Sequence, residues 1–435
     1  MRSLLGRFHR PNARSQSEQL FMLNNLGDGS TLSLDFTTGV LDPRLTFTRS
    51  TTGTYIGSDG LIKTMAAAPT NDPTKARFDY DPITLTPRGL LIEGSAVNYM
   101  LESTSLSGYS NTNMVAVTSG TETDPEGNAN SAKQIYATSG ALNYHGFFRS
   151  TTAGTNTQIT ISIWAKARNY TFLFLSDLAT GRASVRFNLN TGATDNNFGA
   201  GFVSAKATPF PNNWWRCEMV VNVTASTAYA WAFGGTPSGA TLNGFGTQYA
   251  GTGNAADGIY CYGFQVEAGS GASSYIPTVA STGNRAADDC QLLNLTTMGF
   301  NASEGTIYTD VGVRLNTGSQ RNYTFLPASG SNNQIFEGSG TALNVYSSGS
   351  FVAQIGTSPL SASKIAAGYA VNDYAVSVNG AAVVTDTSGA LPSSLTKLTI
   401  GGSIVNAAAY ANGCIRTFKY WPTRLPNAQL QALTT

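Results

Sequence analysis

The sequence is poor in charge, in histidine and in the short motifs that accompany catalysis. Only 12% of its 435 residues are charged, and the formal net charge is +1. A nucleic-acid partner would require a concentrated basic face, so none is expected. The sequence has two histidines, His9 and His145, so few residues could act as the base of a Ser-His-Asp triad. The chain also has no GxSxG elbow, HExxH pair or phosphate-binding loop, and we expect no enzymatic role and no catalytic residue.

Long apolar runs are also missing. No stretch of about 18 apolar residues occurs, which excludes a membrane-spanning helix. The first twenty residues carry arginines but no apolar core, so we do not expect them to be a secretory signal. We therefore expect synthesis in the cytoplasm and exit by lysis or within an assembled particle.

Metal-ligand and redox spacings are absent as well. The four cysteines form no CxxC pair, and we expect buried free thiols. A Cys217–Cys261 bridge between two sheets remains the alternative. No loop shows the oxygen-ligand spacing of a calcium site, so no cofactor is expected, and a structural calcium on a sheet edge stays open. Glu218 and Glu267 are the conceivable glycosidase pair, although Arg216 beside Glu218 favours an ion pair.

Aromatic residues and turn formers are plentiful instead. The chain has 19 Tyr, 21 Phe, 5 Trp and 46 Gly. Apolar and polar residues alternate over residues 32–37, 157–164, 185–190 and 217–223, which is typical of half-buried strands. Asn379-Gly380 lies between two apolar runs and predicts a hairpin. These patterns indicate an all-β protein built from β-sandwiches.

One stretch carries a family resemblance. Residues 258–269, 274–278 and 284–288 read GIYCYGFQVEAG, SYIPT and NRAAD. Earlier runs in the expected order are LDPR (41–44), TFTR (46–49), GLLIE (89–93), WAKA (164–167), FNLNTG (187–192) and WWRC (214–217). The set resembles the jelly-roll segments of phage tail-fibre, head-fibre and other appendage proteins. Residues 300–435, with YAVSVNG and GCIRTFKYW, resemble a concanavalin/laminin-G-like sandwich.

The resemblance implies an all-β fold of two tandem β-sandwiches behind an extended arm. We expect an anchoring arm at 1–30, a leading segment of short strands at 31–102 that packs on the jelly roll, the jelly roll at 103–290, a linker at 291–299 and the second sandwich at 300–435. Arg49, Asp79 and Glu93 in the leading segment could form a polar site, but buried ion pairs between short strands are the favoured interpretation.

The same resemblance implies a function by contact. Jelly rolls of this shape often bind carbohydrate on aromatic rings, and the candidate residues are Tyr144, His145, Trp214 and Trp231; the alternative is that the tryptophans fill the core. The arm is expected to anchor the chain to other virion proteins through Arg2, Arg7, Phe8, Arg10, Arg14, Leu20 and Phe21.

We therefore expect a virion protein, a tail or head fibre or spike subunit, that contacts host-surface glycans during adsorption. By resemblance to fibres it would form a homotrimer. Two alternatives remain: a capsid or neck decoration or joining protein without a receptor role, and a polysaccharide-degrading spike enzyme.

Overall fold

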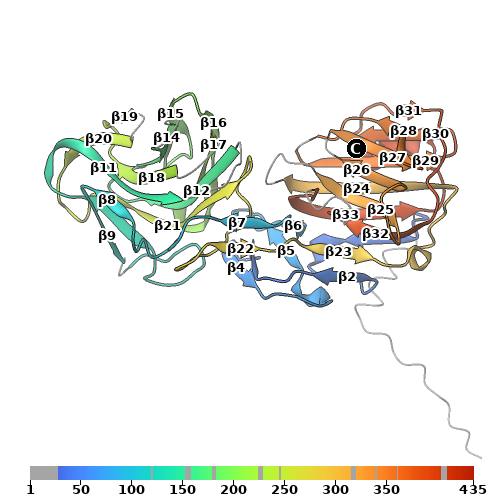
Figure 1. The fold of residues 1–435 in the computed structure, drawn as a ribbon, viewed down its shortest axis with the longest axis horizontal. Coiled ribbons are helices and arrows are strands. Elements are labelled where there is room, and N and C mark those ends of the chain that lie inside the picture. The colour runs from blue at the N-terminus through green and yellow to red at the C-terminus, as the bar shows by residue number, and fades with distance from the viewer. Residues whose placement is uncertain are drawn as a thin grey trace, which may run out of the picture.

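Two β-sandwiches lie side by side in the computed structural model, and the leading segment lies between them and along one side of the second (Figure 1). The structure describes residues 28–118, 121–151, 158–178, 183–223, 229–243, 246–314, 320–338, 340–359, 361–402 and 409–435. The expected anchoring residues of the arm, from Arg2 to Phe21, lie outside this part. The all-β class with two sandwiches is confirmed.

The first sandwich is the expected jelly roll. Its six-stranded sheet has the order β16-β17-β12-β21-β10-β9 (Phe202–Phe210, Trp214–Asn222, Gln158–Ala167, Gly258–Ala268, Lys133–Ala137 and Met114–Thr118). The facing sheet has the order β15-β14-β13-β18-β11-β20-β19 (Thr194–Phe198, Ser184–Asn188, Phe172–Asp177, Tyr229–Thr236, Gly140–Thr151, Gly246–Gly251 and Thr241–Asn243), and β8 (Ser110–Thr112) pairs with β11. Ile159, Ile161 and Ile163 of β12 face the core between the sheets, as their alternation predicts.

The second sandwich also has two sheets. One runs β31-β30-β29-β24-β33-β6-β5 (Val384–Asp386, Asp373–Val378, Ser363–Ala370, Glu304–Arg314, Gly413–Trp421, Pro87–Ile92 and Arg77–Tyr80), with β1 (Leu32–Asp35) on β33. The other runs β2-β23-β32-β25-β26-β27-β28 (Leu45–Thr48, Asp289–Leu292, Leu395–Ile400, Arg321–Pro327, Gln334–Gly338, Thr341–Ser347 and Ser350–Ile355). The terminal helix α2 (Asn427–Thr434) buries Leu430 against this sandwich.

Strands β1, β2, β5 and β6 of the leading segment belong to the second sandwich, which corrects the expected domain boundary. The expected packing of this segment on the jelly roll is present at Ile62, which shares a buried cluster with Trp164 and Trp214. Leu32, Leu34 and Phe47 lie in the same core as Phe325 and Phe418, because β1, β2, β5 and β6 complete its two sheets. The expected linker at 291–299 is also wrong at its start, since β23 reaches Leu292 as a sheet strand. The jelly roll is therefore an insertion between β6 and β23.

A bulge reverses the side-chain alternation of β21. Ile259 and Cys261 face the jelly-roll core before it, and Phe264 and Val266 face the same core after it. The register against β12 shifts at this point, and Gly263 has a φ of 67°. A positive φ inserts one extra residue into the strand without strain at glycine. Strict alternation of residues 258–269 predicts that Phe264 and Val266 share a face with Tyr260 and Tyr262; this prediction is wrong, because the bulge places the two pairs in different cores.

The four cysteines are buried and free. Cys217 on β17 and Cys261 on β21 flank β12 within one sheet, so the alternative bridge between two sheets does not form. The Asn379-Gly380 turn is present, with φ of 50° and 74°. No helix in the described ranges is long and apolar enough to cross a membrane.

Candidate functional site

The short strand β5 separates two environments by alternation. Arg77 and Asp79 are buried toward the seam with the jelly roll, and Phe78 and Tyr80 point the opposite way into a groove. The hairpin of β3 (Gly53–Ile56) and β4 (Ile62–Met65) lies against β5. The leading segment thus has one polar buried face and one aromatic open face.

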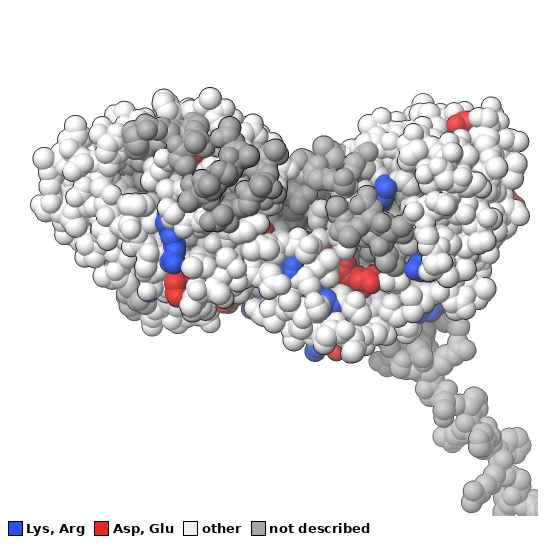
Figure 2. Space-filling model, in the orientation of Figure 1, with Lys and Arg blue, Asp and Glu red and all other residues white. Residues whose placement is uncertain are grey.

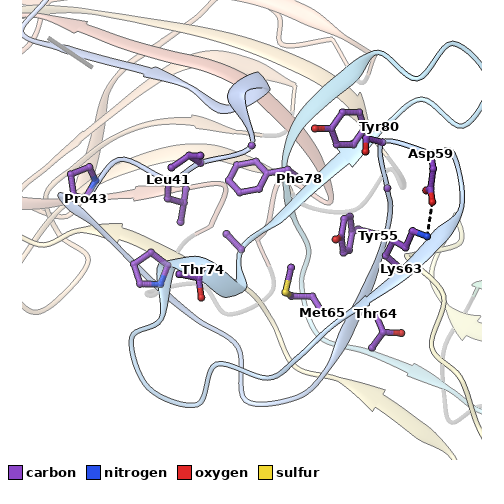
Figure 3. Close-up of a pocket in the computed structure, with 16 residues that line it drawn as sticks. Leu41, Pro43, Tyr55, Asp59, Lys63, Thr64, Met65, Thr74, Phe78 and Tyr80 are labelled. Carbon is purple, nitrogen blue, oxygen red and sulfur yellow. Dashed lines mark ion pairs between the residues drawn. The ribbon is translucent and has the colours of Figure 1, made fainter. Parts of the chain in front are cut away.

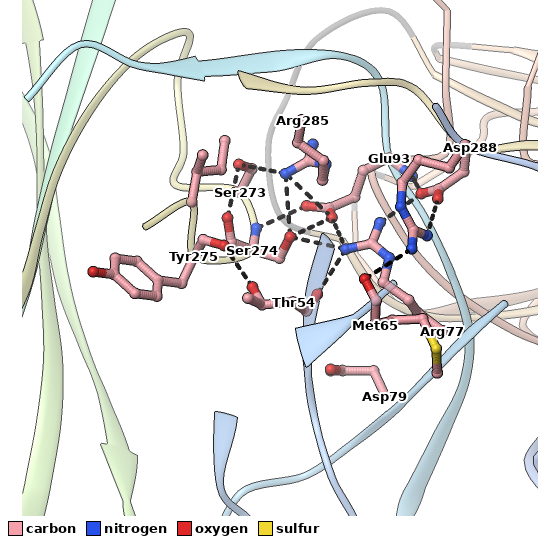
Figure 4. A network of polar contacts seen from close by, with 12 residues as sticks. Thr54, Met65, Arg77, Asp79, Glu93, Ser273, Ser274, Tyr275, Arg285 and Asp288 are labelled. Atoms are coloured by element: carbon pink, nitrogen blue, oxygen red, sulfur yellow. Dashed lines mark hydrogen bonds and ion pairs between the residues drawn. The ribbon is translucent and has the colours of Figure 1, made fainter. Parts of the chain in front are cut away.

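The buried face holds an ion network centred on Asp288, shown in Figure 4. Arg49 Nη1 lies 3.0 Å from Asp288 Oδ1, and Arg77 Nη2 lies 2.5 Å from Asp288 Oδ2. The amide of Glu93 also donates to Asp288 Oδ2, at 2.9 Å. All three charged side chains are fully buried. The carboxylate of the RAAD run therefore joins three separate parts of the leading segment: strand β5 and the residues that directly follow β2 and β6.

Glu93 forms the second centre of the network. Its Oε2 accepts from Arg77 Nη1 at 2.8 Å and lies 3.4 Å from Arg285 Nη1. Ser274 donates its amide and its hydroxyl to the same carboxylate, at 2.8 and 2.7 Å. Arg285 Nη2 donates to the carbonyl of Gly94 at 2.7 Å. Residues from the GLLIE, SYIPT and RAAD runs thus meet at one place.

The charges of the network determine its ionisation. Burial alone would raise the pKa of Glu93, but Arg285, Arg77 and the Ser274 donors outweigh it and lower this pKa to about 2. Asp79 lies at the edge of the network, where burial raises its pKa to about 6 against the weaker effects of the Ile56 amide and Arg88. Asp79 Oδ2 nevertheless lies 3.6 Å from Arg88 Nη1, so the favoured ion-pair interpretation is confirmed for all three residues, Arg49, Asp79 and Glu93.

The glycosidase candidates Glu218 and Glu267 have structural partners. Glu218 accepts from the amide of Ala272 at 3.2 Å and pairs with Lys206 at 3.4 Å. Glu267 accepts from the amide and the hydroxyl of Ser273. Both carboxylates are buried and hold the turn that follows β21. The partner expected for Glu218, Arg216, donates instead to Ser162 and the Ser273 carbonyl.

The two predicted tryptophan platforms are buried. Trp231 is 0% exposed, stacks on Tyr229 and donates to Thr151. Trp214 is 2% exposed and donates to the Thr123 carbonyl. Their indole faces cannot reach a sugar, and their prediction as carbohydrate ligands is wrong. Both fill cores, which was the alternative interpretation.

Tyr144 and His145 do adjoin a surface depression of about 350 Å³ on the outer face of the eight-stranded sheet. Phe148, Phe174 and Thr112 line it as well. The His145 ring itself turns inward, where it stacks on Tyr249 at 4.1 Å. Burial lowers the pKa of His145, and its Nδ1 lies 2.9 Å from the Asn143 carbonyl. Tyr144 is half-buried, and its ring is the predicted platform that remains open to a ligand.

A hollow of about 980 Å³ lies on the open face of the leading segment, where no ligand site was predicted (Figure 3). Tyr55, Phe78 and Tyr80 surround it together with Met65 and Leu41. The three rings are half-buried. The alternation of β5 was the pattern that could have revealed it.

Charge is sparse on the described part of one face of the molecule. Figure 2 shows scattered lysine, arginine and acidic side chains on a mostly uncharged face. Within the described ranges, no three His, Cys, Asp or Glu side chains gather as metal ligands would. Any ligand held on this surface must be recognised mainly by uncharged groups.

No family model and no curated protein matches the sequence. The solved structures to which the chain is similar include the CBM40 module of Ruminococcus gnavus IT-sialidase bound to sialyllactose (13% identity, 33% of this chain and 92% of that one, TM-score 0.29). Another is a mutant Trypanosoma rangeli sialidase with trans-sialidase activity (9% identity, 69% of this chain and 60% of that one, TM-score 0.25). A third is mouse laminin α1 LG4-5 (10% identity, 78% of this chain and 93% of that one, TM-score 0.22). At these TM-scores the similarities carry no argument about function.

Proposed function

We propose that the chain is a non-catalytic subunit of a phage appendage, a fibre or spike that contacts host-surface glycans. The observation that carries this proposal is the place of the shared motif residues. Four of these residues bond to one another or to Arg77 in the buried ion network that connects separate segments of the chain: Glu93, Ser274, Arg285 and Asp288. A motif with that role specifies a rigid architecture, as a particle component needs, and its own carboxylates, Glu93 and Asp288, are held in ion pairs.

Glycan contact is proposed at the depression beside Tyr144. A half-buried tyrosine offers a ring face to a sugar while its hydroxyl, which accepts from Asn243 at 2.8 Å, holds the ring in place. One such contact is weak. Several copies at fixed geometry raise the effective concentration, and a homotrimer anchored by the arm would supply them.

The test of the particle role is localisation on virions of the encoding phage. Gold-labelled antibody against the purified chain should mark tail or head appendages in electron micrographs. Deletion of residues 1–27 should remove the chain from otherwise intact particles. Label spread over the capsid or at the neck would instead favour a decoration or joining protein, and unlabelled particles would refute the proposal.

The test of glycan contact uses the purified full chain on an array of host-surface oligosaccharides. Binding should fall in Tyr144→Ala and persist in Tyr136→Ala, a matched control because Tyr136 is also half-buried in the jelly roll but lies on the other sheet. Binding that is equal in the two variants would exclude this depression. Release of oligosaccharides from polysaccharide would show the chain to be an enzyme.

A further inference from the structure

The groove on the leading segment is large enough for an extended ligand. It is formed by the β3–β4 hairpin, β5, the loop at residues 39–43 and the short 3-10 helix η2 (Pro73–Lys75). Its volume of about 980 Å³ is at the upper end of ligand sites, which span roughly 300–1,000 Å³. The depression beside Tyr144, at about 350 Å³, has space for a much shorter ligand.

The floor of the groove is fixed from behind. Phe78 and Tyr80 alternate along β5 with Arg77 and Asp79, and Tyr55 neighbours Thr54 on β3. Arg77 is held by Asp288, by Glu93 and by the Thr54 carbonyl at 2.7 Å. The backbone under the aromatic rings is therefore tied to the ion network. Rings on a fixed backbone lose little conformational freedom when a ligand binds.

The charges in the groove are already paired. Lys63 Nζ lies 2.6 Å from Asp59 Oδ2, and these are the two charged side chains among the lining residues described. The other polar groups are hydroxyls, from Ser58, Thr64 and Thr74 at the rim and from the two tyrosines. An ionic ligand finds no unpaired counter-charge here. A ligand with apolar ring faces and hydroxyl edges matches both the aromatic rings and the rim.

We propose that this groove binds a neutral oligosaccharide, with sugar rings stacked on Tyr55 and Tyr80 and hydroxyls bonded at the rim. The proposal goes beyond the contact at Tyr144, because the two hollows lie on different segments. It also rests on the general function of glycan contact, so its test must separate the two.

The experiment titrates the purified full chain by calorimetry with neutral and sialylated oligosaccharides of about three to six sugar units. The variants are Tyr55→Ala/Tyr80→Ala, Tyr144→Ala and the control Tyr136→Ala, each checked for a near-native melting temperature. We expect at least one neutral oligosaccharide to bind about tenfold or more weakly to the double variant, and as well to Tyr136→Ala as to the wild type. In Tyr144→Ala this binding should persist, while the separate, weaker contact at the Tyr144 depression is lost.

Each other outcome has a defined meaning. Loss of binding in Tyr144→Ala alone would overturn the groove proposal and leave the general function standing. Binding of sialylated oligosaccharides alone would overturn the neutral class. Binding by no oligosaccharide would overturn both proposals. If removal of residues 1–27 were needed before any sugar bound, the groove would be a seat for the arm and the proposal would fail.

Discussion

The guanidinium of Arg77 and the carboxylate of Asp288 form an ion pair of 2.5 Å, although 211 residues separate them in the chain. The whole jelly roll lies between them in sequence. The pair therefore closes the polypeptide at the point where the inserted sandwich leaves and rejoins its host. Breaking it should loosen both sandwiches at once.

The first prediction concerns that pair. Asp288→Asn removes the carboxylate that pairs with buried Arg49 and one of the two that pair with buried Arg77. We expect a loss of about 3–5 kcal/mol in the free energy of unfolding, because an uncompensated buried charge is costly. Urea denaturation measures it. The control Asp59→Asn breaks the half-exposed pair with Lys63 and should cost at most about 1 kcal/mol. Similar losses in both variants would contradict a central role of the network.

The raised pKa of Asp79 predicts that the free energy of unfolding decreases as pH rises. Its folded pKa of about 6 exceeds the unfolded value of 3.8, so its favourable contribution is complete below pH 3.8 and lost as pH passes through 6. The change amounts to roughly 3 kcal/mol. Unfolding free energies measured between pH 4 and 7 should therefore vary less in Asp79→Asn than in the wild type. Parallel curves for the two proteins would show that Asp79 is not the group responsible.

The lowered pKa of Glu93 predicts the opposite pH dependence of the free energy of unfolding, at lower pH. Its folded pKa of about 2 lies below the unfolded value of 4.5, so its stabilisation is present above pH 4.5 and lost as pH falls toward 2. Acid unfolding followed by tryptophan fluorescence should have its midpoint in this window. In Glu93→Gln the protein should already be less stable at pH 7, and the further loss below pH 4.5 should shrink.

The thiols should be unreactive until the protein unfolds. Burial raises the pKa of Cys261 to about 12 and also raises those of Cys217, Cys290 and Cys414. Thiolate is the reacting species, and it is scarce as well as inaccessible here. Ellman's reagent should titrate no thiol in the native state and four in guanidinium chloride. Fewer than four after denaturation without reductant would indicate a disulfide.

Gly89 should resist substitution. It has a φ of 100°, and a Cβ there would lie 2.2 Å from the Ile415 carbonyl oxygen of β33. Gly89→Ala must therefore push β6 off the sheet and should cost more than about 2 kcal/mol. Gly140→Ala is the control, since nothing lies within 4 Å of its Cβ position. Melting temperatures of the two variants make the comparison.

Local sequence patterns were sufficient to predict many of the strands and one turn. Strands such as β12 and β17 follow from simple alternation, because one face of each packs on a core. The Asn379-Gly380 turn follows from residues that tolerate positive φ. The ion-pair interpretation of Arg49 and Glu93 also follows from composition, because charged residues among short apolar strands need partners.

Local sequence patterns could not predict which strands pair across long distances in the chain. Nothing in Leu32 or Leu34 specifies that β1 pairs with β33 rather than with a nearer strand. A single positive φ at Gly263 reversed the faces of β21, and alternation cannot foresee where a glycine becomes a bulge. Exposed and buried aromatic residues also look alike in sequence, which explains the errors at Trp214 and Trp231.

The placement of the jelly roll between β6 and β23 has a consequence for biosynthesis. The ribosome completes the inserted sandwich well before it makes β33, the strand on which β1, β6 and β24 pair. The jelly roll can thus fold while the leading strands wait with unpaired edges, which are prone to aggregation. A nascent chain arrested before residue 413 would carry a folded jelly roll and an incomplete second sandwich. The second sandwich could close only after the last residues of the chain are translated.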